Sequence, residues 1–232
     1  TALVLGSQAL SGSSVVIDRL QVVQPRKPYD APNWLPSDRP VKIGELMQAK
    51  QLAVSGYNPG DITVPLNFPP DLFTWRNEGA PLNLKYRYTP QEKSYNSSFI
   101  ISFNDALIQS QNLLSRDRLD SSVLRTLKSD DSLDRETNVL LPLNSVALQS
   151  RLQLRYMFDY IKQGQCNDII IDNMRGAIDP ESTLDLSGYD HFIAMPNLGV
   201  FKDSGFPFTR LADLSQTAVV LPDDAGVADL NA

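Results

Sequence analysis

Residues 151–160, RLQLRYMFDY, alternate apolar and polar side chains. The apolar side chains would share one face of an extended strand; they are Leu152, Leu154, Tyr156, Phe158 and Tyr160. The opposite face would be polar except for Met157. At helical spacing the same apolar residues would be spread around the axis and would bury no common surface. The pattern therefore predicts a half-buried, central β-strand.

Two further stretches repeat this alternation, LNLKYRY at residues 82–88 and SFIISF at residues 98–103. The second stretch runs directly into Asn104 and Asp105, two residue types that tolerate positive φ and therefore favour a tight hairpin. Together the three stretches predict an antiparallel sheet with one wet face. The rest of the chain is expected to supply its partner layer.

The sequence patterns for the remaining elements are weaker. Strands are expected at residues 13–23, 61–66 and 138–143 and around 191–195. An amphipathic helix is expected over 116–131, where four apolar residues recur at helical spacing; they are Leu119, Val123, Leu124 and Leu127. Five prolines in the sixteen residues 25–40 exclude a central strand or helix. We expect this segment to be an ordered strap pinned by Tyr29 and Trp34.

The two ends of the chain differ from its middle. Residues 1–12 are typical of the last turns of a helix, with Gly12 just past its end. The apolar run at 217–221 is typical of a buried parallel strand that opens a βα unit. Because neither element could be buried alone, we expect both to be pieces of flanking α/β domains and the chain to be an internal part of a longer protein.

Composition excludes several classes of function. The net charge of −6 argues against a nucleic-acid surface, which needs a clustered excess of cations. The single Cys166 permits no intrachain disulfide, and its role is left open. No run of about 18 apolar residues is present, so no bilayer span is expected. Glycine-rich phosphate-binding motifs are absent from the sequence as well.

The inventory of catalytic and metal-ligating residues is equally sparse. His191 is the only histidine, from which we expect neither a nucleophilic triad nor a zinc site, and we interpret it as a strand residue with a hydrogen-bonded ring. Asp130, Asp131 and Asp134 lack the spacing of a calcium loop, so a solvated loop is favoured. A pair of carboxylates facing each other, as in a glycosidase, stays open because sequence does not give their separation. We therefore expect no catalytic residue, metal or cofactor.

Aromatic residues near the expected strand ends suggest a sugar-binding surface. Phe73, Trp75 and Arg76 lie together in LFTWRNEG, and Tyr57 precedes the strand at 61–66. A flat aromatic face packs against the C–H bonds of a sugar ring while neighbouring polar groups bond its hydroxyls. We predict that these four residues bind a sugar, with a place in the core as the alternative for Trp75. Tyr86 and Tyr88, on the inward face of their strand, are predicted to belong to the core instead.

Four junction segments are distinctive: RKPYDAPNWLPSDRPVKIGEL, GDITVPLNFPPDLFTWR, MRGAIDPESTLDLS and, most specifically, GFPFTRLADLSQTAVVLPD. They resemble the periplasmic B subunit of bacterial cellulose synthase. The resemblance covers nearly the whole chain. It implies a mainly β jelly-roll sandwich that resembles carbohydrate-binding modules. The tail of one flavodoxin-like domain would occupy residues 1–12, the jelly roll 13–210, and the start of the next flavodoxin-like domain 211–232.

The resemblance also implies a function. The B subunit is not an enzyme; it docks on the membrane-embedded catalytic A subunit and is thought to guide the nascent glucan through the periplasm. It is held at the inner membrane by an anchor outside this segment, and B subunits could also associate with one another. The family is often labelled as cyclic di-GMP-binding, but no nucleotide site is expected in this segment. A purely structural jelly roll without sugar affinity is the main alternative, and a glycoside hydrolase or lyase is the third.

Overall fold

The computed structural model describes residues 3–5, 34–56, 58–75, 78–94, 96–119, 131–147, 149–159, 174–210 and 217–220. The chain divides into two compact units. One is Leu35–Ile193, and the other combines Thr1–Trp34 with Ala194–Ala232. Each unit is described by itself below.

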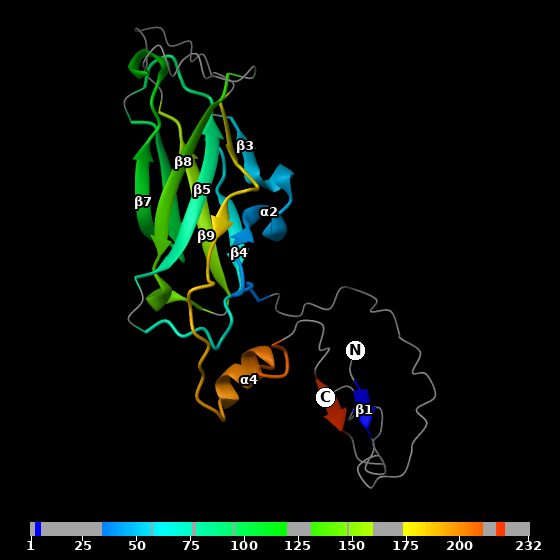
Figure 1. Cartoon of the computed structure of the whole chain (residues 1–232). Coiled ribbons are helices and arrows are strands. Elements are labelled where there is room, and N and C mark those ends of the chain that lie inside the picture. The colour runs from blue at the N-terminus through cyan, green and yellow to red at the C-terminus, as the bar shows by residue number, and fades with distance from the viewer. Residues whose placement is uncertain are drawn as a thin grey trace. The chain divides into compact units, whose positions relative to one another are not determined.

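The larger unit contains two antiparallel sheets (Figure 1). In the first sheet, β5 pairs with β8 on one side and with both β10 and β11 on the other. β10 pairs with one half of β5 and β11 with the other half, so the two are parts of one broken strand line. β3 pairs with β10 and β2 pairs with β11, so these two form a second broken line on its outer side. The strands of this sheet are β2 (Val41–Lys42), β3 (Ala53–Ser55), β5 (Ala80–Tyr88), β8 (Leu133–Leu141), β10 (Arg175–Ile178) and β11 (Thr183–Leu184).

The second sheet has the order β4-β9-β6-β7. Its strands are β4 (Ile62–Leu66), β9 (Ser150–Met157), β6 (Ser98–Phe103) and β7 (Ala106–Asn112). Each broken line counts as one strand, so β2 with β3 is line 1 and β10 with β11 is line 8. With the lines numbered along the chain, the strand order is 6-3-8-1 in the first sheet and 2-7-4-5 in the second. This nested pattern, in which line 1 pairs with 8, 2 with 7, 3 with 6 and 4 with 5, is that of a jelly roll. The expected fold class is confirmed.

The core lies between the two sheets and is centred on aromatic rings from both. Tyr86 of β5 stacks on Phe99 of β6 with ring centroids 4.4 Å apart, and Phe99 lies 4.8 Å from Tyr156 of β9. Tyr86 and Tyr88 are 4% and 2% exposed, so their predicted place in the core is confirmed. The predicted central position of the strand at 151–160 is also confirmed, because β9 lies between β4 and β6.

The predicted hairpin joins β6 to β7. Asn104 and Asp105 have φ values of 48° and 67°, as a two-residue type I′ turn requires. The Asn104 side chain also ties this turn to the connection between β8 and β9, since its amide nitrogen donates to the Ser145 carbonyl at 2.8 Å and its oxygen accepts from the Arg151 amide at 2.9 Å. Ser145 closes the short helix η3 (Leu143–Ser145).

The break between β10 and β11 is held by a buried hydroxyl. Ser182 donates from Oγ to the carbonyl of Lys85 at 3.1 Å and accepts from the Lys85 amide at 3.0 Å, and thus replaces the missing ladder partner. Opposite this break, the outer line is interrupted by α2 (Ile43–Leu46) and η1 (Ala49–Leu52). Gly44 donates to the Pro180 carbonyl there, and a Cβ on Gly44 would lie 2.7 Å from the Pro180 Cβ.

Two expectations about the larger unit were wrong, and a third is tested only at its start. The three alternating stretches do not form one sheet, because β5 belongs to the first sheet while β6 and β9 belong to the second. Residues 191–195 form no strand; a single bridge joins Leu72 to His191. The expected helix over 116–131 begins as the single 3-10 turn η2 (Arg116–Arg118), after which Leu119 is extended, with its side chain in the core. The rest of that helix lies outside the described residues, as do the expected strand at 13–23, Tyr29, Tyr160 and Cys166.

The smaller unit corrects one expectation and supports another. β1 (Leu3–Leu5) is a strand rather than part of a helix, and it pairs in parallel with β12 (Ala218–Val220), as predicted for the apolar run at 217–221. A tertiary partner here decides the conformation of a segment too short to be a stable helix alone. The unit also contains α4 (Leu198–Ser204), which is capped by the Asn197 side chain and ends at Gly205 with a φ of 70°.

Candidate sugar-binding site

Two of the four predicted sugar-binding residues lie in the loop that follows β4. Trp75 is 65% exposed, and Phe73 is partly buried beside it, with ring centroids 6.4 Å apart. Tyr57 and Arg76 lie outside the described residues, so their part in the site stays a prediction. We call residues 71–75 the aromatic loop. It lies at one end of the sandwich (Figure 1).

The aromatic loop is held by residues 190–193, which we call the closing segment. The Phe73 amide donates to the Asp190 carbonyl at 2.8 Å, and the Phe192 amide donates to the Asp71 carbonyl at 2.6 Å. These two bonds flank the isolated bridge between the segments and form a short antiparallel ladder. The ladder fixes the backbone of the loop, so its aromatic side chains project from a supported surface.

Phe192 adds a third ring to this surface. It is 67% exposed, and its ring meets that of Phe73 edge to face at a centroid distance of 6.0 Å. Sequence reasoning missed Phe192 because it placed the residue in a strand. Its exposure follows from the single-bridge geometry, which leaves the segment without a neighbouring sheet strand. The term "aromatic site" below means Phe73, Trp75 and Phe192.

A chain of polar groups lies next to the aromatic site. Asp71 is only 6% exposed, and its Oδ1 lies 3.1 Å from Nδ1 of His191. The other ring nitrogen of His191, Nε2, lies 2.6 Å from Oγ of Ser37 in the strap. The prediction of a hydrogen-bonded His191 ring is therefore confirmed. The order Ser-His-Asp is also that of a nucleophilic triad, which needs one histidine only, so the lone histidine was not sufficient ground to exclude one.

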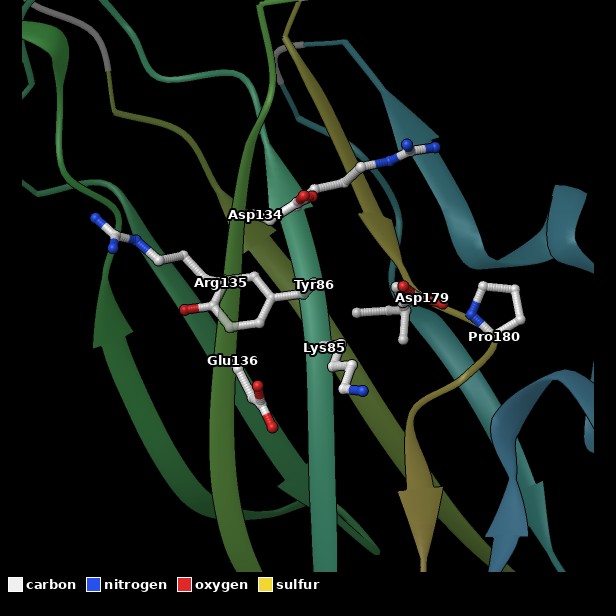
Figure 2. Close-up of a pocket in the computed structure, with 9 residues that line it drawn as sticks. Lys85, Tyr86, Asp134, Arg135, Glu136, Asp179 and Pro180 are labelled. Carbon is white, nitrogen blue, oxygen red and sulfur yellow. The ribbon is translucent and has the colours of Figure 1, made fainter. Parts of the chain in front are cut away.

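A groove of about 420 Å³ lies on the first sheet. Figure 2 shows Lys85 of β5 between Glu136 of β8 and Asp179 after β10. Among the residues that line the groove, three are cationic and three anionic, so their charges balance; the other charged residues are Arg87, Asp134 and Arg135. Such an interleaved surface suits cross-strand ion pairing better than a strongly anionic ligand.

The aromatic residue that lines this groove is not available for stacking. Burial raises the pKa of Tyr86 to about 12, and its hydroxyl donates to Oε1 of Gln111 at 2.8 Å. Its ring packs on Phe99 in the core. The groove therefore lacks a ring face for a sugar among its lining residues, and the aromatic site is the stronger candidate.

The described residues contain no group of three or more side chains suited to a metal ion. Asp131 forms an ion pair with Arg116 at 3.3 Å, Asp134 lies opposite Arg87 in the β5–β8 register, and Asp130 is not among the described residues. Within the described part of the chain, no helix is both long and apolar enough to cross a membrane.

Jelly-roll topology combined with exposed aromatic rings at one end is typical of carbohydrate-binding modules. Comparison with family models agrees with this class. The model described as "Cellulose synthase BcsB, second CBM domain" matches residues 40–183, and "Cellulose synthase BcsB, second FD domain" matches residues 191–232. The chain belongs to the cellulose synthase BcsB family. The boundaries expected from the sequence, after residues 12 and 210, stay a prediction.

Individual relatives point to the same family. A "Cyclic di-GMP-binding protein" of Pseudomonas fluorescens (strain SBW25) is 60% identical over 233 residues, which cover 100% of this chain and 31% of the relative. The protein of that name in Escherichia coli (strain K12) is 41% identical over 225 residues, covering 94% and 28%. "Putative cellulose synthase 2" of Komagataeibacter xylinus is 36% identical over 228 residues, covering 96% and 15%. The chain thus spans less than a third of these relatives.

Proposed function

We propose that this chain is part of a non-catalytic subunit of a bacterial cellulose synthase complex, and that its jelly roll contacts the nascent β-1,4-glucan in the periplasm. The observation that carries this proposal is the exposure of Trp75 and Phe192, at 65% and 67%, beside Phe73 at one end of a carbohydrate-binding-type domain. Family membership and the printed names of the relatives support the wider role.

The expected contact is weak. One aromatic platform with a few hydrogen bonds would contribute about 4 kcal/mol, which corresponds to roughly millimolar affinity. Weak binding suits a surface along which a polymer must slide, because tight binding would hold the chain in place. The catalytic A subunit is the proposed neighbour in the complex, and an anchor elsewhere in the full-length protein is the proposed tether to the inner membrane.

The relatives' names mention cyclic di-GMP, and we propose that this part of the protein does not bind it. The balanced charges of the groove in Figure 2 support this view, since a ligand with two phosphates needs a local excess of cations. Titration of the chain with the nucleotide should leave its amide resonances unchanged. Saturable shifts around Lys85 and Arg87 would contradict the proposal.

The test of glucan binding is an NMR titration with cellohexaose, because this method detects millimolar affinity. Shifts should cluster on residues 73–77 and 192, and Trp75→Ala should abolish them. Leu107→Ala is the matched control, since Leu107 on β7 is similarly exposed, at 64%, but lies outside the aromatic site.

Two other outcomes would replace the proposal. A spectrum that does not respond to saturating sugar would indicate a purely structural jelly roll that holds neighbouring domains or subunits in register. Release of reducing ends from glucan would indicate a glycoside hydrolase or lyase instead.

A further inference from the structure

We propose that the aromatic site is completed by a directional hydrogen-bond acceptor, the Oγ of Ser37, and that its direction is set by Asp71 through His191. The inference rests on the proposed glucan contact and deepens it. It assigns the site a preference for neutral, hydroxyl-rich saccharides over anionic ones.

The positions of the protons on His191 and Ser37 follow from the buried carboxylate of Asp71. The carboxylate of Asp71, 6% exposed, can only accept, so we place the proton of a neutral His191 ring on Nδ1, which lies 3.1 Å from Asp71 Oδ1. In the neutral imidazole the other nitrogen, Nε2, is then an acceptor. With this tautomer the Ser37 hydroxyl at 2.6 Å directs its only proton to Nε2. Its two oxygen lone pairs remain for another partner.

Ser37 is partly exposed, so those lone pairs can be reached by a ligand. His191 is the neighbour of Phe192 in the closing segment, and Asp71 belongs to the aromatic loop. The same short ladder that supports the aromatic rings thus supports the polar chain. A sugar ring on the aromatic site would present its equatorial hydroxyls sideways, toward groups at the edge of the rings. We infer that Ser37 accepts from one of them, because its partner His191 and Asp71 belong to the two segments that carry the rings.

The charge of the region decides the class of saccharide. Asp71 contributes a carboxylate to the row of polar groups Ser37, His191 and Asp71. Asp38 follows Ser37 in the sequence, and Asp190 precedes His191. An acceptor backed by the Asp71 carboxylate favours a hydroxyl donor and disfavours a uronate or phosphate. The expected ligand is therefore a neutral glucan, and a polyuronate should bind more weakly.

The test is the cellohexaose titration of the full chain, repeated with substitutions. Ser37→Ala and Phe192→Ala should each weaken binding roughly threefold to tenfold, the loss expected for one hydrogen bond or one ring contact. Ser37→Thr keeps the hydroxyl and should restore binding. Ser187→Ala, an exposed serine at a turn outside the site, is the control. The ¹⁵N shift of His191 Nε2 should be that of an unprotonated nitrogen and should change in Ser37→Ala.

The outcomes separate the inference from the proposed function. If wild type binds, Trp75→Ala does not, and Ser37→Ala binds as wild type does, the inference falls and the glucan contact stands. If wild type does not bind, both fall. Equal affinity for an oligouronate of the same length would overturn the preference for neutral sugars. Covalent labelling of Ser37 by a fluorophosphonate would show a nucleophile in place of the acceptor.

Discussion

The ring of Tyr156 lies directly against the backbone of Gly176, which belongs to the opposite sheet. A Cβ on Gly176 would lie 2.6 Å from Cδ2 of Tyr156, closer than real contacts allow. The hydroxyl of Tyr156 then reaches past this point to donate toward the carbonyl of Ala177 at 2.9 Å. A glycine in a strand thus marks a close approach rather than a turn.

Gly176→Ala should destabilise the protein by about 1–3 kcal/mol, because the added methyl group forces the Tyr156 ring out of a packed core. Urea unfolding followed by circular dichroism would measure the change. Gly60→Ala is the control, since a Cβ there meets nothing within 4 Å. An unchanged midpoint for Gly176→Ala would show that the sheets can move apart at no cost.

Alkaline pH should weaken the core through its tyrosines. Burial raises the pKa of Tyr86 from 10.0 to about 12, and it raises the pKa of Tyr156 as well. A raised pKa means that the neutral form is favoured in the fold, so this stability is present below pH 10 and is lost as pH rises through about 12.

The free energy of unfolding, measured by urea titration at a series of pH values, should fall over this window. In Tyr86→Phe it should fall less steeply, because one of the buried tyrosines no longer titrates. Parallel curves for the two proteins would contradict this account of Tyr86.

At the level of elements, the first sheet is built from broken strand lines. The β10–β11 line is interrupted at residues 179–182, and Ser182 repairs the interruption by bonding both backbone groups of Lys85. Ser182 itself is 0% exposed, so water cannot take its place. One hydroxyl therefore lets a strand bend without leaving unpaired buried groups.

Ser182→Ala should destabilise the protein by about 1–3 kcal/mol, the cost of leaving the Lys85 amide without a partner, since the Lys85 carbonyl still accepts from the Asp179 amide at 2.8 Å. Thermal unfolding would show it as a lower Tm. Ser187→Ala removes an exposed hydroxyl from the turn that follows and should change the Tm little. Equal effects of the two substitutions would mean that the backbone closes the gap itself.

At the level of the whole molecule, the jelly-roll unit contains its own core. It comprises 159 residues, counted from 35 to 193 inclusive, and both of its sheets are complete within that range. A unit of this size buries enough surface to fold alone.

The fragment 35–193 should therefore unfold cooperatively, with a free energy of unfolding within about 1 kcal/mol of the corresponding transition in the full chain. Urea unfolding of both proteins would measure this. A fragment that unfolds without a cooperative transition would show that residues of the other unit are needed for the core.

The candidate site could be predicted only in part. Trp75 and Phe73 were found because large aromatic residues beside a strand end are visible in a sequence. Phe192, Ser37 and Asp71 were not found, because their roles depend on a ladder between segments more than a hundred residues apart. The sequence has no local signal for the Ser37–His191 contact, whose partners are separated by 154 positions.

Local sequence by itself determined which residues face inward and where the chain reverses. Period-two alternation sets the buried face of β5, β6 and β9 through the geometry of a pleated strand, and Asn104 with Asp105 sets the hairpin through their tolerance of positive φ. Only the tertiary structure decided to which sheet each strand belongs, since strands of identical alternation fit either layer of a sandwich. The pairing of β1 with β12 and the gathering of Ser37, Asp71 and His191 were decided in the same way, because both rest on contacts between segments far apart in the chain.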